Sequence, residues 1–139
     1  MIKFKTQSIT KQDAICLIKN LCKDFDLSIP EIKIFEKTDK VSGYYKDSMN
    51  NKFRASIVLH NLDIATVIHE FCHHLEFERD PNTCSTHRIT FHRICFEVRD
   101  WCSSVYGFDC WGINGYEHTK SFEKALYEWK CKKFPEYYK

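Results

Sequence analysis

The segment FRASIVLHNLDIATVIHEFCHHLEFER, residues 53–79, changes its hydrophobic period halfway along. Over residues 53–60, apolar side chains alternate with others, which is the period of a β-strand with one covered face. Over residues 65–75 they recur every three or four positions, which is the period of an amphipathic helix. Asn61 or Asp63 can cap the start of that helix. The segment therefore predicts a strand that leads directly into a helix.

The sequence before this segment predicts one helix and two further strands. Residues 11–25 carry apolar side chains at helical spacing, and residues 31–37 and 41–46 are rich in strand-forming side chains. Residues 38–40 are typical of a tight turn between these two runs, and residues 47–51 of a second hairpin loop. We therefore expect three sequential strands joined by hairpins.

The sequence after it predicts two more helices. Asp80–Asn82 breaks the preceding helix, and Ser85 or Thr86 opens a longer helix that Gly107 stops. A short helix follows over residues 121–133. The order helix, three strands, three helices predicts the α+β class, and no linker divides the chain, so we expect all 139 residues to form a single domain.

Composition excludes several classes of protein. Hydrophobic residues make up 43% of the chain and charged residues 29%, which excludes disordered, fibrous and coiled-coil chains. The net charge of +2 is too small to indicate nucleic-acid binding by itself. No apolar run approaches the roughly 18–20 residues needed to cross a membrane, and residues 1–10 lack the apolar region of a secretory signal. We therefore expect no membrane partner and an intracellular location, cytoplasmic or, in a eukaryote, nuclear.

The cysteines are numerous but show no metal-binding or redox spacing. None of the eight forms a C-x-x-C pair, which excludes a zinc ribbon and a thioredoxin-type motif. Without a secretory signal, we expect reduced thiols that pack as small hydrophobic side chains.

Residues 69–73, HEFCH, carry the chemistry of the central helix. His69 and His73 are four residues apart, so both imidazoles lie on one helix face and can bind one ion. Zn²⁺ accepts neutral imidazole nitrogens, and Glu70 can act as a general base toward a water in the same site. His74 points away from this face, so we expect it to pack instead. Two alternatives stay open: an accidental match with solvated histidines, and a metal site without turnover.

A catalytic zinc site needs a third protein ligand. The downstream sequence offers three candidates, which are His87 at the start of the next helix and His92 and Glu97 within it. His87 and His92 would be about 140° apart on a helix, so we do not expect both to bind the same ion. Spacing alone leaves the choice among the three open.

These residues resemble a known family. HEFCH at 69–73, followed by HRITF at 87–91, is similar to the SprT-like (Spartan-type) metallopeptidase domain. That family carries HExxH and then a third zinc histidine in an H-G-x-x-F/W segment. The resemblance covers roughly residues 1–106 and implies a zincin-like domain that uses Zn²⁺. The site residues it implies are the zinc ligands His69, His73 and His87 and the catalytic Glu70.

The chain also departs from the family pattern. Phe91 matches the family aromatic, but Arg88 occupies the position of the usual glycine. Residues 107–139 hold only Cys110 and Cys131, so the zinc ribbon common in the family is absent from this C-terminal extension. Eukaryotic members act on DNA-bound proteins, and the resemblance therefore implies a role in DNA–protein crosslink repair.

The sequence thus predicts a zinc metallopeptidase that hydrolyses peptide bonds in a protein or peptide substrate. We expect residues 53–60 to form an edge strand that binds an extended substrate by strand addition. The competing hypothesis is a non-catalytic zinc-containing module that binds DNA. Residues 120–139 combine six lysines with interleaved aromatic residues, a composition typical of single-strand binding, although an amphipathic closing helix with a solvated lysine face explains it better.

Overall fold

The structure is a computed structural model that describes residues 8–35, 43–47, 54–82, 87–107 and 119–138. Its helices are α1 (Lys11–Asp24), α2 (Ile64–Arg79), α3 (Ile89–Tyr106) and α4 (Lys120–Lys133), and its strands are β1 (Glu31–Ile34), β2 (Gly43–Lys46) and β3 (Ser56–Leu59). The predicted α+β class and the predicted order of helices and strands are confirmed.

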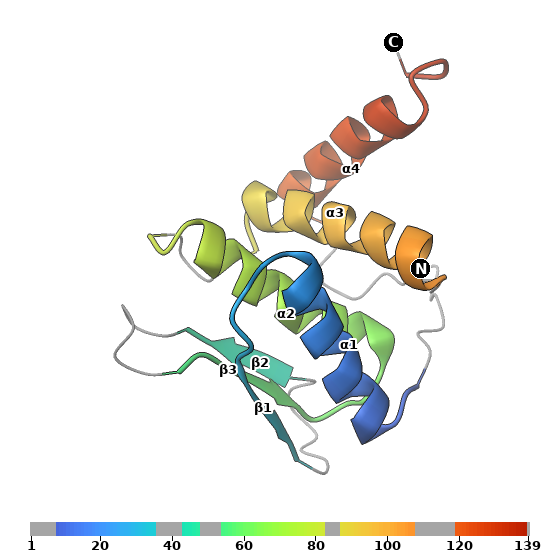
Figure 1. Cartoon of the computed structure of the whole chain (residues 1–139). Coiled ribbons are helices and arrows are strands. Elements are labelled where there is room, and N and C mark those ends of the chain that lie inside the picture. The colour runs from blue at the N-terminus through green and yellow to red at the C-terminus, as the bar shows by residue number, and fades with distance from the viewer. Residues whose placement is uncertain (1–7, 36–42, 48–53, 83–86, 108–118, 139) are drawn as a thin grey trace.

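The elements stack in layers outward from the sheet (Figure 1). Helix α2 packs on β2 and β3, α1 and α3 pack on α2, and α4 contacts α3. The described helices all lie on one side of the sheet. Helix α2, which carries HEFCH, is therefore the central helix of the molecule and has neighbours on several sides.

The sheet corrects the predicted arrangement of strands. β3 lies in the middle, parallel to β1 and antiparallel to β2. The hairpin expected between residues 31–37 and 41–46 is wrong because β1 and β2 are not neighbours, and its turn, residues 38–40, lies outside the described residues. The edge-strand prediction for residues 53–60 is also wrong. Ser56–Leu59 are all buried, since a central strand has a partner on each side.

The helix ends largely follow local capping rules. Asp63 caps α2 as predicted, and α3 ends at the predicted Gly107, whose φ of 70° is left-handed. The predicted start of α3 at Ser85 or Thr86 is wrong. The helix begins only at Ile89, because the residue at its N-cap is still extended and makes no side-chain capping bond. None of the described helices is both long enough and apolar enough to span a bilayer.

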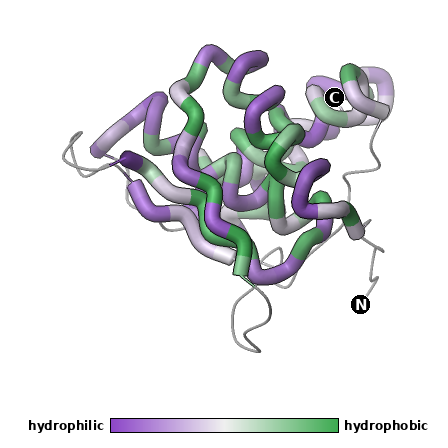
Figure 2. The backbone as a smooth tube through the Cα atoms, turned by 60° about the horizontal axis from the view of Figure 1, so that its bottom comes forward, coloured by the Kyte–Doolittle hydropathy of each residue, from purple (hydrophilic) through white to green (hydrophobic). Residues whose placement is uncertain are grey.

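The core fills the space between α1, α2, α3 and the sheet. Figure 2 shows hydrophobic and hydrophilic segments alternating along the helices, as amphipathic helices require. The largest fully buried side chains of the core include Phe71, Phe91, Ile18, Leu21 and Ile57. The described cysteines are free thiols, and several of them pack in the core as small hydrophobic side chains: Cys22, Cys72, Cys95 and Cys102.

Candidate metal centre

Three histidine side chains converge beside α2. The Nε2 atom of His87 lies 3.1 Å from Nε2 of His69 and 3.2 Å from Nε2 of His73. Within the described ranges, these three form the one group of histidine, cysteine or acidic side chains that could hold a metal ion. The structure therefore brings the predicted motif pair together with one of the candidates for the third ligand.

The spacing of the three nitrogens fits a shared cation. In a tetrahedral site with Zn–N bonds of about 2.0–2.1 Å, two ligand nitrogens lie about 3.3–3.4 Å apart. Hydrogen bonding alone does not account for both short distances. The Nε2 of His87 offers either one hydrogen or one lone pair in the ring plane, and so makes one linear hydrogen bond rather than two. Three lone pairs directed at one ion account for both.

The protonation state of the cluster suits metal binding. Burial, and then the neighbouring histidines, lower the pKa of His69 to about 3. The same causes lower the pKa of His73 to about 3, and burial lowers the pKa of His87. All three imidazoles are therefore neutral near pH 7, which is the form that binds a metal ion.

Two helices and one aromatic ring position the imidazoles. His69 and His73 lie one turn apart on α2, and His87 reaches them from two residues before α3. Phe91, in the first turn of α3 and 1% exposed, touches all three rings. Its ring centroid lies 4.2 Å from that of His73, in a stacked geometry, and 5.1 and 5.0 Å from those of His69 and His87. The packing of α3 on α2 thus orients the ligands.

The other two candidates for the third ligand lie elsewhere. His92 is buried with its ring against Phe91 and Phe122, at centroid distances of 5.8 and 5.5 Å. The Glu97 carboxylate accepts two hydrogen bonds from the Arg79 guanidinium, at 3.1 and 2.6 Å. Of the three alternatives that spacing left open, the structure brings only His87 to the pair.

Glu70 lies beside the histidines, against the first residue of β2. Its side chain is buried, and burial raises its pKa to about 8, whereas a cation in the site would lower it again. A Cβ added at Gly43 would lie 3.4 Å from Cγ and Oε2 of Glu70 and 2.7 Å from the carbonyl oxygen of Val58. Glycine at position 43 therefore allows β2 to lie close to the backbone of β3, whereas a Cβ there would only make ordinary van der Waals contact with Glu70. The sequence signal for this was available, because glycine inside a strand often marks a close approach.

These side chains border a cleft with a volume of about 210 Å³. It is lined by Gly43, Tyr44 and Tyr45 of β2, by the three histidines and by Glu70. One cleft therefore contains the Glu70 carboxylate, the histidine cluster and residues of β2.

His74 ties β2 to α2 and, as expected, is not part of the metal cluster. It is fully buried and lies 2.9 Å, through Nε2, from the carbonyl oxygen of Ser28 and 3.0 Å, through Nδ1, from the hydroxyl of Tyr45. Burial lowers its pKa, so the neutral ring donates from Nε2 to Ser28 and accepts at Nδ1 from Tyr45. The hydrogen bond to Tyr45 fixes the strand that borders the cleft.

The basic and aromatic C-terminal segment is only partly available to a ligand. Phe122 is buried, and Trp129 stacks on Phe96 and donates a hydrogen bond to Asp100 at 2.7 Å. Tyr137, by contrast, is 80% exposed. Packing of α4 on α3 thus accounts for part of this composition, and DNA binding by residues 120–139 stays a prediction.

Comparisons of the chain with protein-family models, with curated proteins and with solved structures find no match. The resemblance to the SprT-like family therefore stays a prediction from residues 69–73 and 87–91, and the geometry of the site is what supports a functional proposal.

Proposed function

We propose that this protein is a zinc-dependent metallopeptidase with a zincin-like domain, which hydrolyses peptide bonds in a protein or peptide substrate. The observation that carries the proposal is the convergence of three histidines in one cleft with Glu70. The Nε2 atoms of His69 and His73 lie 3.1 and 3.2 Å from Nε2 of His87. Three protein ligands with an adjacent carboxylate are typical of catalytic zinc sites, which keep a fourth position open.

The chemistry divides between the ion and the glutamate. Zn²⁺ held by the three histidines would supply a Lewis acid that acidifies a water molecule and polarises a substrate carbonyl. The Glu70 carboxylate would accept the proton of the attacking water and then donate it to the leaving amine nitrogen. The backbone of β2 at Gly43 lies beside this carboxylate, and both line the cleft.

The proposed substrate position follows from the observed strand order. Residues 53–60 cannot add a substrate strand, because β3 is central. Among the described strands β2 lies at the edge of the sheet, and Gly43–Tyr45 line the cleft. We therefore place an extended substrate along the side of β2 that faces away from β3, where main-chain hydrogen bonds would bring its peptide bond to the histidine cluster.

Glu70→Gln tests the proposed mechanism. The amide keeps the size of the side chain but cannot accept a proton, and Glu70 is not one of the three metal ligands. We expect cleavage of an unfolded protein substrate to fall by about 10²–10⁴-fold, while zinc content and melting temperature stay at the wild-type values. Glu31→Gln, at an exposed position of β1, should cleave at the wild-type rate. Full cleavage by Glu70→Gln would refute the mechanism.

A further inference from the structure

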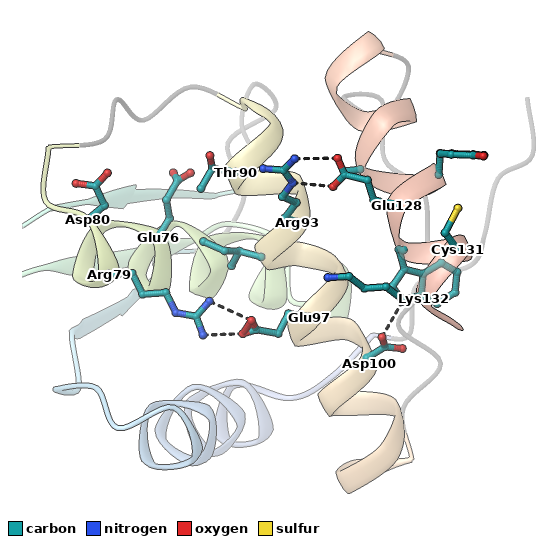
Figure 3. A pocket seen from close by; sticks show the side chains of 14 residues that line it. Glu76, Arg79, Asp80, Thr90, Arg93, Glu97, Asp100, Glu128, Cys131 and Lys132 are labelled. Atoms are coloured by element: carbon teal, nitrogen blue, oxygen red, sulfur yellow. Dashed lines mark hydrogen bonds and ion pairs between the residues drawn. The ribbon is translucent and has the colours of Figure 1, made fainter. Parts of the chain in front are cut away.

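A second and larger cavity lies between α4 and the C-terminal part of α2, across α3 (Figure 3). Its volume is about 890 Å³, which lies within the roughly 300–1,000 Å³ of typical ligand sites. Ile94, Ala125 and Trp129 give it an apolar lining. Neither the three histidines nor Glu70 line it, so this groove is distinct from the metal cleft.

Both arginines of the groove are already paired. Figure 3 shows the Arg93 guanidinium bridging from α3 to the Glu128 carboxylate of α4, with two hydrogen bonds of 2.8 Å. It also shows Arg79 turned toward Glu97, to which it donates two hydrogen bonds. Lys132, on the α4 side, forms no ion pair with an acidic group among the described residues. Two arginine–glutamate pairs therefore border the apolar lining, and neither arginine is available to a ligand.

One carboxylate of the groove is unpaired. Glu76 lines the groove with only 2% of its surface exposed, and within the part of the chain that the structure describes no hydrogen bond or ion pair reaches its carboxylate. Arg79, one turn further along α2, donates to Glu97, and the charge that acts on Glu76 is the like charge of Asp80. Burial, and then Asp80, raise the pKa of Glu76 to about 7. A cation placed beside Glu76 would favour the ionised carboxylate, so the charge that complements this end of the groove is positive.

We propose that this groove docks a polypeptide segment of a partner protein, which directs a lysine or arginine at Glu76 and Asp80 and packs apolar side chains on Ile94, Ala125 and Trp129. The segment is expected to carry a cation because the groove presents Glu76 and Asp80, and apolar residues beside it because the lining is apolar. The cavity is several times larger than one side chain, which is why the occupant is a peptide segment rather than a lone amine. An apolar centre with a rim of paired charges is also the usual anatomy of a protein interface.

The test uses the zinc-loaded full chain and a phage-displayed library of random 12-residue peptides. We expect enriched peptides to carry a lysine or arginine between apolar residues. In fluorescence anisotropy with the synthesised peptides, Glu76→Gln should weaken binding by at least about tenfold. Replacing the lysine or arginine of the peptide with norleucine should weaken binding to the wild type by the same factor. The same replacement should hardly change binding to Glu76→Gln, because the two changes remove the same interaction.

Controls separate this groove from other binding surfaces. Glu123→Gln, an exposed glutamate of α4 outside the groove, should bind like the wild type. Thr90→Arg, at an exposed position that lines the groove, should block binding while circular dichroism stays unchanged. Peptides that bind the wild type and Glu76→Gln equally, or a library that yields no binder, would overturn the proposal. A dimer that depends on Glu76 in sedimentation would also overturn the proposal, because the occupant of the groove would then be a second copy of the chain. Saturation of the groove by n-butylammonium alone would overturn it too, because the occupant would then be a small cation.

Discussion

His87 supplies the third nitrogen of the cluster from outside either helix, and the cluster depends on this one side chain. Its replacement by alanine leaves two ligands from α2. We expect the zinc content of the dialysed protein, one ion per chain in the wild type, to fall by half or more in His87→Ala, measured by plasma mass spectrometry. Glu97→Gln, which removes a carboxylate paired with Arg79, should retain the full ion. Full zinc in His87→Ala would show that another residue is the third ligand.

Glu76 should make the stability of the protein depend on pH. Its pKa is raised from 4.5 to about 7 in the folded state, so the folded chain holds a proton that the unfolded chain has released between about pH 4.5 and 7. Stability contributed by this group is therefore present below pH 4.5 and is lost as the pH rises to 7. Glu76→Gln should be more stable than the wild type by about 1–3 kcal/mol at pH 8 and similar at pH 4.5, as measured by urea unfolding. A constant difference across this range would contradict the prediction.

At the scale of elements, the cleft depends on how closely β2 lies against α2. The hydrogen bond between Tyr45 and His74 joins β2 to α2, and Gly43 of β2 lines the cleft together with Glu70. Within the described residues, β2 pairs with β3 alone. The surroundings of the Glu70 carboxylate thus depend on the contact between a strand and a helix and not on the helix alone.

Gly43→Ala should disturb both stability and activity. The added Cβ would lie 2.7 Å from a backbone oxygen of β3, so β2 must shift, at a cost of about 1–3 kcal/mol in the free energy of unfolding. Because β2 lines the cleft together with Glu70, we expect peptide hydrolysis to fall by about 10–100-fold. Gly107→Ala is the matched control. It forces alanine into a left-handed conformation at the end of α3, costs about 1 kcal/mol, and should leave hydrolysis unchanged. Equal hydrolysis by both variants would contradict the role given to Gly43.

At the scale of the whole molecule, the proposed ion joins segments that are 14–18 residues apart in sequence. It would connect α2 with the segment that leads into α3, across the contact on which the core depends. Zinc should therefore stabilise the fold. At a free concentration of 100 times Kd it contributes about 2.7 kcal/mol, which corresponds to a rise in Tm of roughly 8–13 °C.

This whole-molecule prediction is checked by thermal unfolding of the apoprotein with and without added zinc. The rise in Tm should disappear in His87→Ala, because the ion then binds only one element. It should persist in Glu70→Gln, which removes no ligand. A zinc-independent Tm in the wild type would count against a metal that links α2 and α3.

Features that depend on neighbouring residues can be predicted from the sequence. Apolar spacing predicts every described helix, local capping rules give Asp63 as one of two candidate caps and Gly107 as a stop, and helix geometry pairs His69 with His73. A helix completes its backbone hydrogen bonds within a few residues, so a short stretch of sequence contains the information for its structure.

The tertiary structure alone decided which distant segments meet. It placed β3 between β1 and β2, selected His87 over His92 and Glu97, and brought β2 against Glu70. A strand completes its hydrogen bonds with strands that can lie far along the chain. Hydrophobic alternation does not predict which strands these are. A metal site built from two elements depends in the same way on how they pack, and this packing depends on the whole core.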